Sequence, residues 1–367
     1  MFCKKTIGCY VALTLTRIYG SAKHISNTIL MSIKKIAEMA GVSIGTVDRV
    51  LHGRGRVSEE TKEKIEKIAL QINYKPNLMA SSLSKKRKAT VVILMPDPAE
   101  DEYWQQAWTG IERLLPNAEK QGLDIKNYFY SLDNQKLFNK YAKQIIREKP
   151  DGLILAPNHP ESCSNLLNEC AKVAIPAILF DNQLPGFNPL AFIGTDLRQS
   201  GILCAQLLEM ITHNPGSFAL FHIDPPNSKA HDMIEKELGF KEFMESSHSK
   251  RLIRNFSIDS QQDLENQLDA AFENDIAACL VSNSKTWIVG EYLKKRNLSD
   301  VKLIGFDLIS KNIELLKQGW INFLINQNPE RQARKSLNRF INHFAFGETI
   351  QEKEYLPIEI ITKGNLI

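Results

Sequence analysis

The sequence lacks any run of about 18 uninterrupted apolar residues, so no segment predicts a membrane-spanning helix. Its six cysteines are scattered: they form no Cys-x-x-Cys pair and no cluster with histidines at metal-ligand spacing. We therefore expect buried thiols in a reducing compartment and no metal site. The P-loop, Gly-x-Ser-x-Gly and His-Glu-x-x-His signatures are also missing, so the sequence predicts no catalytic residue and no cofactor.

Acidic residues are missing from residues 1–30, which carry four basic side chains. Residues 31–90 carry 13 basic and 6 acidic side chains, a net charge of +7, whereas residues 91–367 carry 29 basic and 36 acidic ones, a net charge of −7. A basic head on an acidic body predicts one anion-binding module joined to something else. The length of 367 residues suits two or three domains.

The segment MSIKKIAEMAGVSIGTVDRVLH, residues 31–52, has the pattern of a helix-turn-helix. Gly41 suits the left-handed end of a first helix, and Ser43 can cap a second one. Small and apolar residues recur at helical spacing on the faces that would pack together: Ile33, Ile36, Ala37, Ala40, Val47, Val50 and Leu51. A third helix capped by Ser58 would close a three-helix core. Beyond it, residues 77–88 have room for only about two helical turns before the basic run, and such a helix is marginal alone in water.

From Thr90 onward, short apolar runs alternate with amphipathic helices such as Trp104–Gln121 and Asn134–Glu148. The runs are 90–96, 124–131, 151–157, 176–181, 191–196, 217–224, 277–283, 301–307 and 321–327, and YLPIEIITKGNLI is an apparent final strand. This alternation predicts two doubly wound parallel sheets with helices on both faces, divided near Leu190. The polar residue that ends each run then lies at the carboxyl end of a strand, where such sheets bind ligands.

The sequence resembles the lactose-repressor (LacI/GalR) family of bacterial transcription regulators. The segments IKKIAEMAGVSIGTVDRVLHG and VSEETKEKIEKIALQINYKPNLMASSLS carry the resemblance in the head, and DGLILAP, IPAILFD, FIGTD, LIGFDL and INFLINQNPERQA carry it in the body. The resemblance implies an all-α helix-turn-helix domain at 31–76, a hinge helix with a basic linker at 77–89, and a two-lobed, periplasmic-binding-protein-like α/β effector domain at 90–367 with crossovers near 325 and 350. Family members start near the position of Met31. We therefore expect residues 1–30 to be a disordered extension from an upstream start.

The resemblance also implies which residues bind DNA. The second helix would enter the major groove, and the hinge helix would place Leu83 as a wedge in the minor groove. The implied DNA contacts are Ser43, Ile44, Gly45, Thr46, Asp48, Arg49, Asn77, Ala80 and Leu83. The chain departs from the family pattern at three of them: Ile44 and Gly45 stand where larger or polar base readers are usual, and Asp48 replaces a small hydroxyl residue.

A small sugar or sugar derivative held between the two lobes is the ligand that the resemblance implies. Carboxylates and amides would bond its hydroxyl groups, and aromatic rings would stack on its C–H face. The implied ligand residues are Tyr103, Trp104, Asn158, Asp181, Lys236, Asn283, Asp307 and Gln327. The family often has an arginine shortly before the position of Gly239, whereas this chain reads EKEL. Either Lys236 substitutes for that arginine or the anchor is missing.

We therefore expect a cytoplasmic transcription regulator, a repressor controlled by its effector, that binds a near-palindromic operator as a homodimer without membrane contact. No leucine heptad follows the final strand, which predicts assembly no larger than a dimer. Two alternatives remain open. An exported sugar-binding receptor would use residues 1–30, with the apolar stretch Ile7–Leu15, as its signal, but residues 31–88 would then lack a role. A sugar-acting enzyme would use paired carboxylates at the strand ends.

Overall fold

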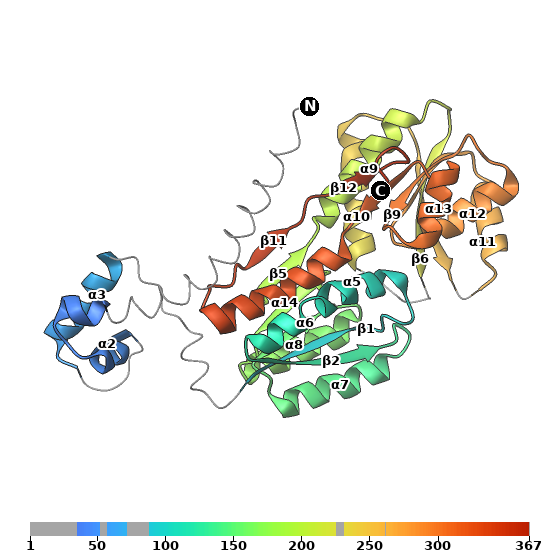
Figure 1. Cartoon of the computed structure of the whole chain (residues 1–367). Helices are drawn as coiled ribbons and strands as arrows, with labels where there is room; N and C mark the ends of the chain where they lie inside the picture. The colour runs from blue at the N-terminus through green and yellow to red at the C-terminus, as the bar shows by residue number, and fades with distance from the viewer. Residues whose placement is uncertain (1–34, 52–56, 72–87, 225–230, 261, 367) are drawn as a thin grey trace, which may run out of the picture. The chain divides into compact units, whose positions relative to one another are not determined.

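The computed structural model of the chain describes residues 35–51, 57–71, 88–224, 231–260 and 262–366 (Figure 1). The chain divides into two compact units, Met1–Lys85 and Lys86–Ile367. The extension 1–30 and the expected hinge helix, with Asn77, Ala80 and Leu83, lie outside the described residues.

In its described part, the first unit consists of three helices around one small core. Residues 35–40 are helical, and α2 (Ile44–Leu51) and α3 (Glu59–Gln71) follow. Gly41 has a left-handed backbone, φ 70°, at the end of the first helix, and the Ser43 hydroxyl accepts a hydrogen bond from the N–H of Thr46 at 3.1 Å. The buried core comprises Ile36, Ala37, Ala40, Val47, Ile65, Ile68 and Ala69. The predicted helix-turn-helix is confirmed.

The second unit contains two sheets, one in each lobe, with six strands each among the described residues. The first sheet has the order β11-β5-β4-β3-β1-β2, and all neighbouring strands are parallel. Its strands are β1 (Ala89–Pro96), β2 (Leu123–Tyr130), β3 (Gly152–Leu155), β4 (Ala177–Asp181), β5 (Ala191–Gly194) and β11 (Lys353–Tyr355). The second sheet repeats this order as β12-β10-β9-β8-β6-β7, with only β12 antiparallel to its neighbour. Its strands are β6 (Ser217–Asp224), β7 (Ile253–Asp259), β8 (Ile276–Val281), β9 (Lys302–Phe306), β10 (Phe323–Asn326) and β12 (Glu359–Ile361). Strands β4 and β9 therefore occupy equivalent positions in the two lobes.

Helices cover both faces of each sheet, as the alternation of runs and helices predicts. The first sheet carries α5 (Glu102–Glu112), α6 (Leu115–Lys120) and α14 (Pro329–Phe346) on one face, and α7 (Gln135–Glu148) and α8 (Pro160–Lys172) on the other. The second sheet carries α9 (Leu197–Ile211) and α10 (His231–Ser246) on one face, and α11 (Leu264–Phe272), α12 (Thr286–Arg296) and α13 (Ser310–Gln318) on the other. The predicted pair of doubly wound sheets is confirmed.

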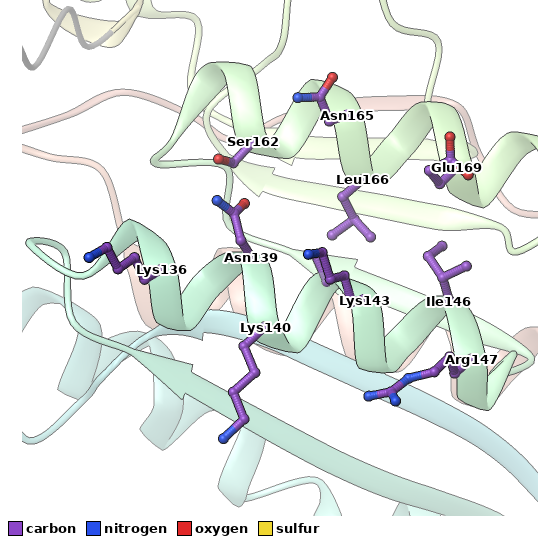
Figure 2. A pocket seen from close by; sticks show the side chains of 11 residues that line it. Lys136, Asn139, Lys140, Lys143, Ile146, Arg147, Ser162, Asn165, Leu166 and Glu169 are labelled. Carbon is purple, nitrogen blue, oxygen red and sulfur yellow. The ribbon is translucent and has the colours of Figure 1, made fainter.

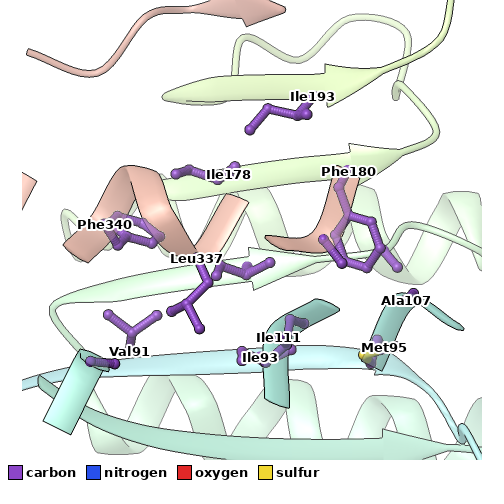
Figure 3. Packing of buried hydrophobic residues seen from close by; sticks show 14 of the residues in the cluster. Val91, Ile93, Met95, Ala107, Ile111, Ile178, Phe180, Ile193, Leu337 and Phe340 are labelled. Atoms are coloured by element: carbon purple, nitrogen blue, oxygen red, sulfur yellow. The ribbon is translucent and has the colours of Figure 1, made fainter. Parts of the chain in front are cut away.

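Within the described residues, the chain passes between the two sheets three times. It leaves the first sheet between 194 and 197, after the position near 190 at which the sequence suggests a break, because β5 still pairs with β4. It returns between 326 and 329, and it passes to the second sheet again between 355 and 359. Helix α14 begins at the second of these passages and packs into the core of the first lobe, where Leu337 and Phe340 lie over the sheet near Ile178 (Figure 3).

Three elements differ from the sequence-based expectation. Strand β7 was not among the predicted runs, because it is an edge strand in which polar residues interrupt the apolar ones. The prediction of a single final strand is wrong, because Pro357 separates β11 from β12, which belong to different sheets. The helix expected at 104–121 is divided into α5 and α6, since Pro116 begins a new first turn.

Helices α9 and α10 touch each other through two glycines. A Cβ atom at Gly201 would lie 1.9 Å from the carbonyl oxygen of Lys236, and one at Gly239 would lie 1.9 Å from that of Arg198. Only glycine allows the two backbones to approach so closely. This contact fixes α10 on the second lobe, with the side chain of Lys236 buried.

Candidate ligand site and nucleic-acid interface

The ends of the equivalent strands β4 and β9 bring two buried aspartates into corresponding positions. Asp181 ends β4 and Asp307 follows β9; both have left-handed backbones, with φ 72° and 69°. Their exposed fractions are 8% and 2%. A non-glycine residue in this backbone region is uncommon, and such residues concentrate at functional sites. Both carboxylates are therefore strong candidates for ligand contact.

Tyr103 and Trp104, at the start of α5, differ in what they contact. The hydroxyl of Tyr103 donates a hydrogen bond to the carboxylate of Asp181, and the N–H of Tyr103 is held at 2.8 Å by Asp101, which caps α5. Trp104 is buried in the core of the first lobe, where its ring meets Tyr103 and Phe180 edge-on. The structure therefore joins Tyr103 to the carboxylate of Asp181 and places Trp104 behind it as packing.

Two glutamines at the passage from β10 to α14 connect the aspartates of the two lobes. The amide nitrogen of Gln327 donates to both carboxylate oxygens of Asp307, at 3.1 and 2.9 Å. The amide nitrogen of Gln332 donates to the carbonyl oxygen of Gln327 at 2.7 Å, and its amide oxygen accepts the N–H of Asp181 at 2.9 Å. A continuous series of hydrogen bonds thus runs from Tyr103 in the first lobe to Asp307 in the second.

Lys236 lies buried beside Asp307. Its ammonium group donates to the carbonyl oxygen of Ser282 at 2.9 Å and lies 4.0 Å from the centre of the Phe306 ring. Burial raises the pKa of the Asp307 carboxyl to about 7, although the charge of Lys236 and the hydrogen bond from Gln327 act in the opposite direction. Lys236 thus offsets part of the effect of burial on the Asp307 carboxyl.

The two predicted asparagines occupy equivalent strand ends as well. Asn158 follows β3, and its side chain donates to the carbonyl oxygen of Ala156 at 3.4 Å. Asn283 follows β8; its side-chain nitrogen donates to the carbonyl oxygen of Ile223, and its side-chain oxygen accepts a hydrogen bond from the N–H of Lys285. Both are half-buried and hold the backbone at strand ends, without a hydrogen bond to the aspartates.

Ser282, His222 and Glu237 form an array of the type found in hydrolases, with 2.9 and 2.8 Å between the bonded atoms. The Ser282 hydroxyl, however, donates to the carbonyl oxygen of Phe221 at 3.2 Å and is 2% exposed. A nucleophile must reach its substrate, so this array serves structure. The described residues also contain no group of three His, Cys, Asp or Glu side chains that could hold a metal ion.

A large groove, of about 1020 Å³, lies elsewhere, between α7 and α8 of the first lobe (Figure 2). Its lining includes Ile146 and Leu166 together with the exposed basic side chains of α7, and none of the predicted ligand residues. The candidate ligand residues at the strand ends thus lie outside this groove.

The lobes also contact each other beside the strand ends. The carboxylate of Glu102, on α5, accepts the N–H of Ser310 at 2.9 and 3.0 Å and its hydroxyl at 2.8 Å. The side chain of Gln106 donates to the carbonyl oxygen of Leu308 at 3.0 Å. A motion of the lobes relative to each other would change these contacts.

Helix α2, which carries most of the predicted DNA contacts, has a short, partly apolar exposed face. Ile44 is 53% exposed, and Gly45 adds no side chain beside it. Arg49 is folded along its own helix, with its guanidinium bonded to the carbonyl oxygen of Gly45 at 3.1 Å and to Thr46 at 3.4 Å. Ser43 caps the helix; the side chain of Asp48 lies outside the described part.

Residues 91–348 match the family described as periplasmic binding protein domain, and residues 32–77 match the bacterial regulatory proteins of the lacI family. The chain therefore belongs to the periplasmic binding protein domain family, and it carries a lacI-type head. The HTH-type transcriptional regulator MalR of Streptococcus pneumoniae is 23% identical over 91% of this chain and 99% of its own length. The ribose operon repressor of Bacillus subtilis is 27% identical over 77% of this chain and 83% of its own length. A solved structure of a candidate LacI transcriptional regulator from Bacteroides fragilis is 29% identical, covers 76% of this chain and 98% of its own, and superposes with a TM-score of 0.70.

With this head, the chain is a DNA-binding transcription regulator, and the exported-receptor alternative is the less supported one. None of the helices in the described residues has the length and apolar character that a membrane span requires. Sequence reasoning missed Gln332, Glu102 and Gln106. The only sequence signal for Gln332 is its position five residues after Gln327, and nothing marks the other two.

Proposed function

We propose that this regulator is a repressor whose affinity for operator DNA is controlled by a small neutral sugar bound between its lobes. The observation that carries the proposal is the pair of buried carboxylates at equivalent strand ends, joined across the lobes through Gln327 and Gln332. Carboxylates and amides are suited to sugar hydroxyl groups, and Tyr103, Asn158 and Asn283 add polar atoms around them.

The charges of the site favour a neutral ligand. Asp181 and Asp307 supply two carboxylates, whereas Lys236 supplies the one buried ammonium among the described residues, and it already lies close to Asp307. A sugar phosphate would bring further negative charge into a buried site that has no second cation among the predicted ligand residues, and such burial is costly. We therefore expect D-ribose to be bound in preference to D-ribose 5-phosphate. Trp104 would act as packing behind Tyr103.

The DNA-binding unit is assigned to residues 31–76, with 77–89 as hinge helix and linker and 90–367 as the effector domain. We infer a homodimer that binds a near-palindromic operator in the cytoplasm, because one short recognition helix reads few bases alone. Ser43, Ile44, Gly45, Thr46, Asp48 and Arg49 would lie in the major groove, and Asn77, Ala80 and Leu83 in the minor groove. No catalytic step is assigned to the protein.

Control of DNA binding follows from linkage. A sugar that binds two lobe arrangements with different affinity shifts the balance between them, and operator DNA must then change the sugar affinity by the same factor. The test is calorimetry of the full chain with D-ribose, D-arabinose, D-glucose and D-galactose. Anisotropy titrations of a selected operator with and without the bound sugar follow. Binding of a sugar with no change in operator affinity would contradict the proposal.

A further inference from the structure

Gln332 holds the passage from β10 to α14 through two buried hydrogen bonds. It is 0% exposed in the first turn of α14, a helix whose Ala333, Leu337 and Phe340 pack into the core of the first lobe. Its amide oxygen accepts the N–H of Asp181 at 2.9 Å, and its amide nitrogen donates to the carbonyl oxygen of Gln327 at 2.7 Å. Gln327 directly follows β10, a strand of the second lobe.

This arrangement needs a carboxamide. One end of the side chain must accept a hydrogen bond and the other must donate one, because its partners are a backbone N–H and a backbone carbonyl. A carboxylate could keep only the bond to Asp181, and an apolar side chain of the same length could keep neither. Buried polar groups that lose their partners are left unsatisfied, so the passage would have to rearrange.

We propose that Gln332 is a positioning residue that couples the two ligand carboxylates. It fixes the backbone of Asp181 through its oxygen, and through Gln327 it fixes the carboxylate of Asp307 in the other lobe. The statement that these carboxylates bind ligand rests on the proposed function, whereas the mechanical link between the lobes does not. Gln332 touches no ligand; it sets the spacing of the groups that do.

Two variants of Gln332 distinguish the contributions of its two hydrogen bonds. Gln332→Met keeps the length of the side chain and removes both hydrogen bonds, and Gln332→Glu keeps the acceptor for Asp181 and loses the donor to Gln327. Ser336→Ala is the matched control. Ser336 is also 0% exposed, one turn further along α14, and its hydroxyl donates at 3.0 Å to the carbonyl oxygen of Gln332, within the same helix. It therefore removes a buried hydrogen bond without touching the passage.

The first measurement needs no ligand. Spin labels carried by unnatural amino acids at the exposed positions Lys140 on α7 and Lys317 on α13 report the distance between the lobes in the full chain. We expect one narrow distance distribution for the parent protein and for Ser336→Ala, and a broadened or shifted one for both Gln332 variants. Unchanged distributions in folded Gln332→Met and Gln332→Glu, judged by circular dichroism, would overturn the proposal.

The second measurement uses calorimetry with D-ribose, D-arabinose, D-glucose and D-galactose. For a sugar that the parent protein binds, we expect at least tenfold weaker binding by both Gln332 variants and a change of less than twofold for Ser336→Ala. Equal affinity in all four proteins would overturn the coupling role. If the parent protein binds none of the sugars, the proposed effector class fails, and the distance measurement still decides the role of Gln332.

Discussion

At the residue scale, the carboxyl of Asp307 makes ligand binding sensitive to pH near neutrality. Burial raises its pKa to about 7, the nearby charge of Asp101 adds to the rise, and Lys236 and Gln327 oppose it. A sugar hydroxyl donates more strongly to a carboxylate than to a neutral carboxyl group, so bound sugar stabilises the ionised form and lowers the pKa. We expect sugar affinity to increase from pH 6 to pH 8, by up to about tenfold for each unit by which the sugar lowers the pKa. Calorimetry across this range measures the effect.

The control for this prediction is Asp307→Asn, which keeps the shape of the side chain and cannot ionise. Its affinity should be lower than that of the parent protein and constant between pH 6 and pH 8. A pH profile that survives unchanged in the asparagine variant would show that another group titrates, and the assignment of the effect to Asp307 would then be wrong.

The sequence predicts the aspartates better than the groups that surround them. Asp181 and Asp307 each end an apolar run, and the carboxyl ends of parallel strands face the ligand side of a sheet, so local pattern and topology lead to the same residues. Gln332 contacts residues from two different lobes, one of them 151 positions away along the chain. No local pattern encodes such a contact. The packing role of Trp104 is also invisible in the sequence, because an aromatic residue next to a strand end suits either role.

At the scale of elements, α13 receives its N-terminal cap from the other lobe. Its own cap residue, Ile309, supplies no side-chain hydrogen bond, and Glu102 on α5 supplies the acceptor instead. The carboxylate also lies at the positive end of the helix dipole. We expect Glu102→Ala to lower the free energy of unfolding by about 1 kcal/mol, as for loss of other N-caps, and Glu102→Gln to lower it by less, since an acceptor oxygen remains. Urea unfolding at low salt measures both.

The matched control is Glu100→Ala, an exposed glutamate shortly before α5 whose side chain has no hydrogen bond or ion pair among the described residues. It should leave the free energy of unfolding unchanged. Equal stability of the Glu102 and Glu100 variants would contradict the capping role.

The crossing of α9 and α10 predicts an unusual sign for a glycine substitution. Replacing a helical glycine by alanine ordinarily stabilises a helix by about 1 kcal/mol. At Gly239 the added Cβ would lie 1.9 Å from the backbone of α9, so the two helices must separate. We expect Gly239→Ala to destabilise the fold by about 3 kcal/mol, in the range of overpacked cores. Gly364 is exposed, and a Cβ there would meet only an ordinary contact at 3.5 Å, so Gly364→Ala should leave the stability almost unchanged. Thermal unfolding measures both variants. A stabilised Gly239→Ala protein would contradict the crossing.

Among the elements, central strands are easier to predict than edge strands. The central strands β3, β4, β8 and β9 are buried almost throughout and read as apolar runs. Strand β7 lies at an edge, and only one of its residues is buried, so its sequence alternates irregularly. The short strands β11 and β12 depend on pairing with distant parts of the chain, which the sequence of YLPIEIITKGNLI does not specify.

At the scale of the whole molecule, net charge distinguishes the DNA-binding head from the effector-binding body. Residues 31–90 have a net charge of +7, and the effector domain after them has −7. An acidic body adds nothing to phosphate binding, so the salt dependence of DNA affinity should arise in the head alone. Each phosphate contact contributes about −0.9 to the slope of log affinity against log salt. We expect operator affinity to fall at least a hundredfold between 50 and 200 mM NaCl, measured by fluorescence anisotropy. Affinity that does not change with ionic strength would exclude the phosphate contacts.

Anisotropy titrations with a full operator and with one half of it test whether two DNA-binding heads bind together. A recognition helix of eight residues with Ile44 and Gly45 on its exposed face offers few base contacts, so one head should discriminate poorly between sequences. A site obtained by selection from random DNA should therefore be a near-palindrome, and a duplex with only one half of it should bind at least a hundredfold more weakly. If the guanidinium of Arg49 leaves Gly45 and contacts a base, Arg49→Ala should weaken binding to the full site more than binding to random DNA. If it contacts only phosphate, the variant should weaken binding to both DNAs equally. Full-strength binding to the half-site would show that one chain is sufficient, and the proposed dimer would then be wrong.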